Sequence, residues 1–112
     1  MPGAEMEHVA CDAAVTLAFT VLGKRWNGMI LSSLGAGPTS FVGLRRAVTG
    51  ISDAVLSDRL TELSDAGLVV RDVDAGPPVA VAYSLTGSGE RLLPILDDLG
   101  RWANDNLVVR AR

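Results

Sequence analysis

Short polar and charged side chains share one face of the segment from Ser52 to Ala66. Leu56, Leu60 and Leu63 recur at spacings of four and three residues, which predicts an amphipathic helix with a buried leucine stripe. Ser57 and Asp58 lie on the opposite face. A serine hydroxyl can bond several bases, and an aspartate can accept from cytosine N4 in the major groove of DNA. This face therefore has the chemistry of base reading.

Basic residues near this helix are candidates for phosphate contacts, which position a protein on DNA without specifying sequence. The set of expected DNA contacts is Lys24, Arg25, Arg45, Arg46, Ser52, Ala54, Ser57, Asp58 and Arg59. The competing interpretation is that these are ordinary solvated residues and that Arg59 pairs with Glu62 or Asp58. The residue pattern alone leaves both interpretations open.

The elements that must position this face follow from local signals. Phe41, Leu44 and Val48 predict a short helix, with Ser40 as its N-cap and Thr49-Gly50-Ile51 as the following turn. Ser52 is the expected N-cap of the second helix, and Gly67 is expected to end it. Together these segments predict a helix-turn-helix over about 41–66.

Two runs rich in β-branched residues follow, over about 68–74 and 79–85. They predict a β-hairpin, or wing, over about 68–85. Pro77 and Pro78 exclude a regular two-residue turn at its tip, because two prolines restrict the backbone. The tip from Asp74 to Val79 carries no basic residue.

Apolar helices are expected on both sides of this unit, over about 12–22 and 86–107, with a further helix over about 25–34. The first helix is apolar on most of its circumference, which predicts burial on more than one side. Pro94 is expected to bend the last helix or shift its start. These helices are expected to form a dimer interface through Val15, Phe19, Leu96, Leu99 and Trp102. The predicted fold class is α+β, mainly helical: a winged helix-turn-helix with N- and C-terminal dimerisation helices, over 11–112 after a flexible tail at 1–10.

Composition, charge and the lack of catalytic residue patterns exclude some classes of function. The chain has 112 residues, 48% of them hydrophobic, and a net charge of -3. Between residues 24 and 71, however, six basic residues outnumber four acidic ones, so the positive balance falls on the expected reading head. We find no nucleophile–base arrangement, so an enzyme is not expected, and neither is a cofactor. His8 lacks the partners that a metal or acid–base site needs.

The termini and the cysteine content indicate location. Residues 1–10 carry acidic side chains and no Lys or Arg, unlike a signal peptide. No apolar run reaches the roughly 18 residues that would span a bilayer. Cys11 is the single cysteine, which excludes an intrachain disulfide and a cysteine-based metal site. We therefore expect a cytoplasmic protein with no membrane contact.

Many short motifs, in this order, resemble the HxlR-type winged-helix regulators, which are related to the MarR repressors. The matching residues are Cys11, Leu22-Gly23-Lys24-Arg25-Trp26, Gly37-Pro38, Phe41, Leu44-Arg45-Arg46, Gly50-Ile51-Ser52, Leu56-Ser57-Asp58-Arg59-Leu60, Leu63, Gly67-Leu68-Val69, Tyr83-Ser84-Leu85-Thr86, Gly89 and Trp102. The resemblance implies a homodimeric DNA-binding regulator, a repressor more often than an activator, acting on a palindromic operator. The run from Gly23 to Gly28 is similar to the branch that senses quinones, aldehydes and oxidants through a thiol.

The resemblance assigns the sensing role to Cys11. A thiolate at a helix N-terminus is stabilised by the helix dipole, while the nearby Asp12 and Glu7 oppose it. Oxidation or alkylation of Cys11 by a small electrophile would then change the spacing of the two reading heads. Two features depart from the family pattern: the cysteine is followed by Asp12 in place of proline, and the wing tip lacks its usual base.

Two alternatives stay open. The protein can instead sense a small ligand in an apolar pocket between the first and last helices. It can also be a winged-helix interaction module without DNA binding, which the acidic wing favours. A salt-insensitive interaction with DNA, or none, would support the second alternative, because phosphate neutralisation makes true DNA binding fall with salt.

Overall fold

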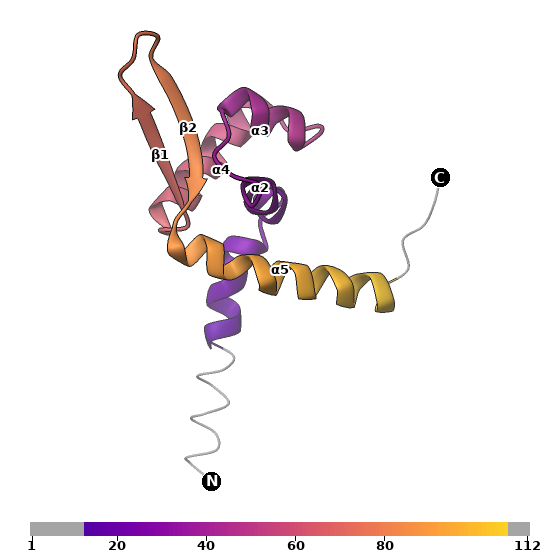
Figure 1. Cartoon of the computed structure of the whole chain (residues 1–112). Coiled ribbons are helices and arrows are strands. Elements are labelled where there is room, and N and C mark those ends of the chain that lie inside the picture. Colours follow the sequence, from indigo (N-terminus) through magenta and orange to yellow (C-terminus); the bar gives the residue numbers. More distant parts are fainter. Residues whose placement is uncertain (1–12, 108–112) are drawn as a thin grey trace.

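The computed structural model describes residues 13–107. A helix over 13–22 leads to α2 (Asn27–Leu34), α3 (Phe41–Ala47) and α4 (Asp53–Asp65). The strands β1 (Val69–Asp74) and β2 (Ala80–Leu85) follow, and α5 (Gly87–Asn106) ends the described chain. Figure 1 shows the two strands projecting as a hairpin from a body of helices, with the far end of α5 directed away from it. This is the predicted mainly helical α+β winged helix-turn-helix.

Local signals place the starts of α3, α4 and α5 as predicted. Three N-cap side chains accept hydrogen bonds from the first turn of their helices: Ser40 from Gly43 N (3.0 Å), Ser52 from Val55 N (3.2 Å) and Thr86 from Gly89 N (3.2 Å). Each of these bonds satisfies a backbone donor that has no partner inside the helix. The turn between α3 and α4 contains Gly50 at a φ of 95°, where a glycine avoids the steric cost of a left-handed backbone.

The core lies between α2, α3, α4 and the base of the hairpin. The predicted stripe of α4 is buried, with exposed fractions of 0% for Leu56, 3% for Leu60 and 0% for Leu63. It packs in one cluster with Ile30, Leu31, Leu34, Leu44, Val48, Ile51 and Val69. The opposite face of α4 is thereby held toward solvent on a rigid support.

The hairpin is anchored at its base by a third segment. β1 and β2 pair antiparallel, with Val69 opposite Leu85 and Asp74 opposite Ala80. Thr39, expected only as part of an extended link, forms a bridge with Tyr83 through two backbone hydrogen bonds of 2.8 and 2.9 Å. The segment before α3 is therefore joined to the middle of β2.

One expectation about the flanking helices is wrong, and the structure refines two others. α2 begins at Asn27, because Trp26 takes a left-handed φ of 83° that interrupts a helix from Arg25. The helix over 13–22 is not buried on several sides within this chain: residues 13–20 are exposed, and only Val21 and Leu22 are partly buried. α5 starts at Gly87 as expected and runs through Pro94 without a shifted start. No helix in the described part of the chain is long and apolar enough to cross a membrane.

Candidate nucleic-acid interface

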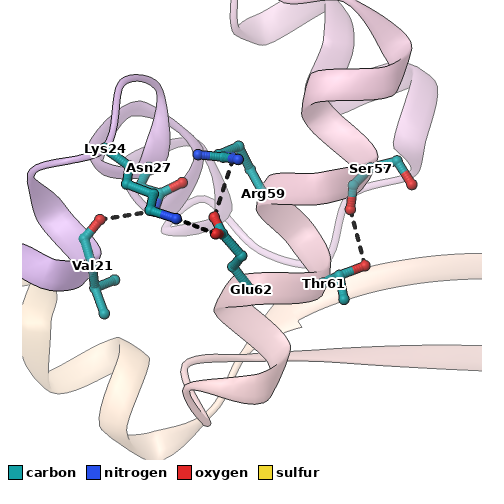
Figure 2. A network of polar contacts seen from close by, with 7 residues as sticks. All are labelled: Val21, Lys24, Asn27, Ser57, Arg59, Thr61 and Glu62. Carbon is teal, nitrogen blue, oxygen red and sulfur yellow. Dashed lines mark hydrogen bonds and ion pairs between the residues drawn. The ribbon is translucent and has the colours of Figure 1, made fainter.

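The exposed face of α4 presents the residues expected to read bases. Ala54, Ser57 and Asp58 are all exposed, on the side away from the leucine stripe. Thr61 Oγ1 donates to the Ser57 carbonyl at 3.1 Å (Figure 2), so the Ser57 hydroxyl is not used in that bond. Ser52 is also exposed, but its oxygen already accepts from Val55 N as the helix cap. The face thus offers one carboxylate and one hydroxyl from successive residues.

The two arginines of α3 differ in their surroundings. One Nη of Arg45 lies 3.1 and 3.3 Å from the two carboxylate oxygens of Asp53, the first residue of α4. This pair connects the two helices across their turn, although exposed ion pairs contribute little to stability. Arg46 is exposed, and no ion pair within residues 13–107 includes it. Of the two arginines, Arg46 is the one available for a phosphate.

Glu62 forms ion pairs with two of the basic residues that were expected to contact phosphates. Figure 2 shows Lys24 and Arg59 converging on its carboxylate, Lys24 from the connection before α2 and Arg59 from one turn earlier on α4. Arg59 Nε lies 3.2 Å from Glu62 Oε1, and the Arg59 side chain is only 22% exposed. The structure therefore confirms the competing interpretation, in which Arg59 pairs with Glu62. Either base could reach a phosphate only by leaving Glu62.

The hydrogen bond from Lys24 lowers the pKa of Glu62, with Arg59 adding to the effect and partial desolvation opposing it. A carboxylate whose pKa is lower in the folded chain stabilises that chain above its ordinary pKa of 4.5, and the stabilisation is lost as pH falls below that value. Glu62 thus acts as a pH-dependent link between α4 and the connection before α2.

We expect Glu62→Gln to lower stability at neutral pH, because Lys24 and Arg59 lose their shared carboxylate. The difference from wild type should shrink as the pH is lowered through 4.5 and below, where Glu62 itself takes up a proton. Urea unfolding followed by circular dichroism at a series of pH values measures this. Asp98→Asn is the matched control, since it breaks an exposed pair with Arg101 on α5. A pH-independent difference for Glu62→Gln would contradict the assignment.

Asn27 is a buried polar residue that the sequence reasoning missed. It is 1% exposed, and its amide nitrogen donates to the Val21 carbonyl at 2.8 Å (Figure 2). This bond joins the end of the helix over 13–22 to the start of α2 across the strained Trp26 backbone. The Arg25 guanidinium lies 4.4 Å from the centre of the Trp26 ring, a cation–π contact that occupies one face of the indole. No periodicity around residue 27 distinguishes this asparagine from an exposed one.

The residues expected at a dimer interface are mostly exposed in the single chain. The exposed fractions are 57% for Val15, 53% for Phe19, 44% for Leu99 and 54% for Trp102. Leu96 is the exception, because it packs partly against the core of its own chain. Exposed apolar side chains that gather in a patch mark interaction sites on protein surfaces.

An apolar groove of about 490 Å³ lies between α2 and α5. Its lining includes Met29, Ala47, Leu96, Leu99 and Ala103. This groove differs from the pocket expected between the first and last helices, because its described walls come from α2, α3 and α5. Cys11 and His8 lie outside the described residues. Within residues 13–107, no group of three His, Cys, Asp or Glu side chains is placed to hold a metal ion.

A helix-turn-helix with an exposed polar second helix, followed by a β-hairpin, defines a winged-helix DNA-binding regulator. The chain belongs to the HxlR-like helix-turn-helix family, whose model matches residues 21–110. The relatives are transcriptional regulators, so the protein is a transcriptional regulator of this type and not an enzyme.

Two relatives from Bacillus subtilis illustrate the match. The HTH-type transcriptional regulator YvaP is 41% identical over 88 residues, which cover 79% of this chain and 82% of YvaP. The HTH-type transcriptional regulator YodB is 39% identical over 87 residues, or 78% of each chain. The reduced form of YodB superposes with a TM-score of 0.77 at 37% identity, covering 82% of this chain and 90% of YodB. Quinone-bound YodB superposes with a TM-score of 0.72 at 35% identity, and the match covers 82% of this chain and 96% of that YodB chain.

Proposed function

We propose that the protein is a homodimeric repressor that binds a palindromic operator and releases it when Cys11 is oxidised or alkylated. The observation that carries the proposal is the exposed face of α4, where Ser57 and Asp58 are held toward solvent by the buried leucine stripe. The proposed base contacts are Ala54, Ser57 and Asp58. Arg25, Arg46 and the cap Ser52 are proposed at the phosphates, joined by Lys24, Arg45 and Arg59 where DNA displaces their carboxylate partners.

The homodimer is supported by the apolar surface of the helix over 13–22 and of α5. Val15, Phe19 and Trp102 are each more than half exposed in the single chain. A second copy is the proposed partner, because a two-fold dimer would present two α4 helices to successive major grooves, about 34–36 Å apart. This spacing also makes binding sensitive to small movements of one protomer against the other.

The proposed signal is an oxidant or a small electrophile. YodB is a relative with solved reduced and quinone-bound forms, which supports a thiol-directed signal here. In the oxidative case, the Cys11 thiols of two protomers lose two protons and two electrons to the oxidant and form one disulfide. An electrophile would instead add to one thiolate without electron transfer.

A chain of contacts from the first helix to the reading helix supports this proposal. The helix over 13–22 is bonded to α2 through Val21 and Asn27, and the following Lys24 is paired with Glu62 of α4. A shift of the first helix would therefore reach α4 through these two contacts. This path supports Cys11 as the switch, although Cys11 itself lies ahead of the described residues.

We expect specific binding to the DNA upstream of the protein's own gene, and its loss on treatment with diamide. Electrophoretic mobility shifts of wild type and Cys11→Ser, with reductant and then with diamide, measure both. Diamide accepts the two electrons and two protons of disulfide formation, so Cys11→Ser should bind normally and ignore it. A diamide response that persists in Cys11→Ser would reject the thiol switch and leave DNA binding intact. If wild type binds neither this DNA nor any duplex recovered from a random-sequence pool, the repressor proposal fails.

A second candidate signal is a small apolar ligand in the groove between α2 and α5. The favouring observation is its volume of about 490 Å³ and its largely apolar lining. A ligand that co-purifies with the protein and weakens DNA binding equally in wild type and Cys11→Ser would select this mechanism. An interaction module without DNA binding is the outcome if no salt-dependent binding to DNA is found.

A further inference from the structure

We propose that the groove between α4 and the hairpin carries one phosphodiester strand of bound DNA, and that Arg71 is the basic residue that holds this strand. The inference rests on the DNA-binding function proposed above. It adds a contact that was not among the residues expected from the sequence, and it places that contact at the base of the wing, away from the tip.

The groove is lined by side chains that can bind a sugar–phosphate strand. Its volume is about 610 Å³. One wall comes from α4 and the other from the hairpin, and the polar side chains that line them are Ser57, Thr61, Ser64, Asp65, Arg71 and Tyr83. Hydroxyl and guanidinium groups are the usual partners of phosphate oxygens. Thr61 already donates to the Ser57 carbonyl, and Arg71 is the one basic residue among the described residues that line the groove.

The strand register separates the charges of the wing. Arg71 is paired opposite Tyr83, and both line the groove beside α4. Because side chains alternate along a strand, Asp72 and Asp74 fall on the other face, opposite Ala82 and Ala80, where they line a separate depression. The acidic residues that argue against a DNA-binding wing therefore point away from the groove, while the one base of β1 points into it.

Arg71 is available for an external anion. It is exposed, and the four ion pairs within residues 13–107 use Lys24, Arg45, Arg59 and Arg101 as their bases. Asp65 lines the same groove near the C-terminal end of α4 and would repel a phosphate there. We therefore place the strand over the half of the groove nearer Ser57, which is also the half with the proposed base contacts.

The position of the hairpin supports this contact for a helix in the major groove. A phosphodiester strand borders each side of that groove, and the hairpin projects beside α4 (Figure 1). The groove between α4 and the hairpin offers a path to the bordering strand on that side. The base of the hairpin is fixed, since the backbone of Tyr83, opposite Arg71, makes two hydrogen bonds with Thr39. Arg71 is thus presented from a rigid support.

Equilibrium binding of Arg71→Ala over a series of KCl concentrations tests the inference. The probe is a fluorescent duplex obtained from a random-sequence pool with the wild-type protein, together with a scrambled duplex. Loss of one phosphate contact should lower the slope of log K against log salt by about 0.9 per protomer, which is about a fivefold loss of affinity per protomer near 0.15 M salt. The loss should be similar on both duplexes, because a phosphate contact carries no sequence information.

Two variants serve as controls. Arg71→Lys keeps the charge and should retain most of the slope. Arg101→Ala makes the same change in net charge on α5, where Arg101 pairs with Asp98, and should leave the slope unchanged. Replacing single phosphates of the duplex by neutral methylphosphonates locates the contact: one position should weaken wild type and leave Arg71→Ala indifferent.

The outcomes separate the inference from the function on which it rests. Wild-type binding with an Arg71→Ala slope equal to that of Arg101→Ala would overturn the Arg71 contact and keep DNA binding. A slope change without any phosphate position that distinguishes Arg71→Ala would also overturn it, because the effect would then be long-range. Failure of the wild type to bind any duplex would overturn both. Thermal melting of each variant shows whether the exposed Arg71 has been replaced without loss of folding.

Discussion

Leu56→Ala is expected to lower the free energy of unfolding by about 2–5 kcal/mol. Leu56 is 0% exposed and belongs to the leucine stripe that attaches α4 to the rest of the core. Truncation removes buried apolar surface and leaves a cavity that the surrounding side chains fill only in part. Since native domains are stable by only about 5–15 kcal/mol, this variant should lose a large share of its stability.

Urea unfolding followed by circular dichroism measures the loss, with all variants at one protein concentration because self-association would add to apparent stability. Val79→Ala is the control: truncation of an aliphatic side chain that is 69% exposed and lies beside the wing tip, outside both proposed dimerisation helices. We expect the control to stay within about 1 kcal/mol of wild type. Equal losses in the two variants would mean that α4 is not held by its leucine stripe.

The second large effect is expected at Gly89, near the start of α5. A Cβ built at this buried position would lie far inside van der Waals distance of the Leu68 carbonyl oxygen, and 3.1 Å from Leu85 Cδ2. The Leu68 carbonyl also accepts from Thr86 N at 3.0 Å, so it cannot move without breaking that bond. We expect Gly89→Ala to cost about 1–3 kcal/mol through overpacking, despite the better helix propensity of alanine.

Gly100→Ala makes the same substitution on the same helix with the opposite expectation. Nothing lies within 4 Å of a Cβ at Gly100, so alanine should be neutral or stabilise the helix by up to about 1 kcal/mol. Thermal melting of the two variants side by side gives the comparison. A Gly89→Ala variant as stable as Gly100→Ala would contradict the prediction, because it would mean that Leu68 and Leu85 can move to make room for the added methyl group.

The joint matters for function because it sets the position of the wing. Leu68 directly precedes β1 and Thr86 directly follows β2, so both lie at the base of the hairpin. Thr86 Oγ1 also donates to the Gly67 carbonyl at 2.6 Å. α4, the hairpin and α5 therefore meet at one point. A change at Gly89 is therefore expected to disturb the groove lined by Arg71 as well as to lower overall stability. DNA binding by Gly89→Ala should be measured at a temperature below its melting transition.

The predicted reading face and the structure agree where local signals dominate. Ser40, Ser52 and Thr86 cap their helices as expected, since a cap depends on residues only two or three positions away. The leucine stripe of α4 is buried as its spacing predicts. The first helix shows the complementary case: its apolar circumference predicts burial but does not say against what, and because most of it is exposed within one chain, its burial in a dimer stays a prediction.

The charge assignments show the limit of sequence reasoning. Lys24 and Arg59 have the residue types of phosphate contacts, yet both pair with Glu62. Arg71 was not among the predicted contacts, and only the strand register shows that its side chain lies on the other face from Asp72 and Asp74. A count of charges along the chain cannot distinguish a base held by a carboxylate from a base that faces an open groove.

The sequence by itself determined the helix-turn-helix, the hairpin, the helix caps and the HxlR-type resemblance, because these depend on periodicity and on contacts between near neighbours. Only the tertiary structure decided the burial of Asn27, the bridge from Thr39 to Tyr83 and the pairing of Lys24 with Glu62, residues 38 positions apart. The physical reason is that such contacts depend on how whole helices and strands pack, and the hydrophobic pattern that drives this packing does not specify which polar groups meet.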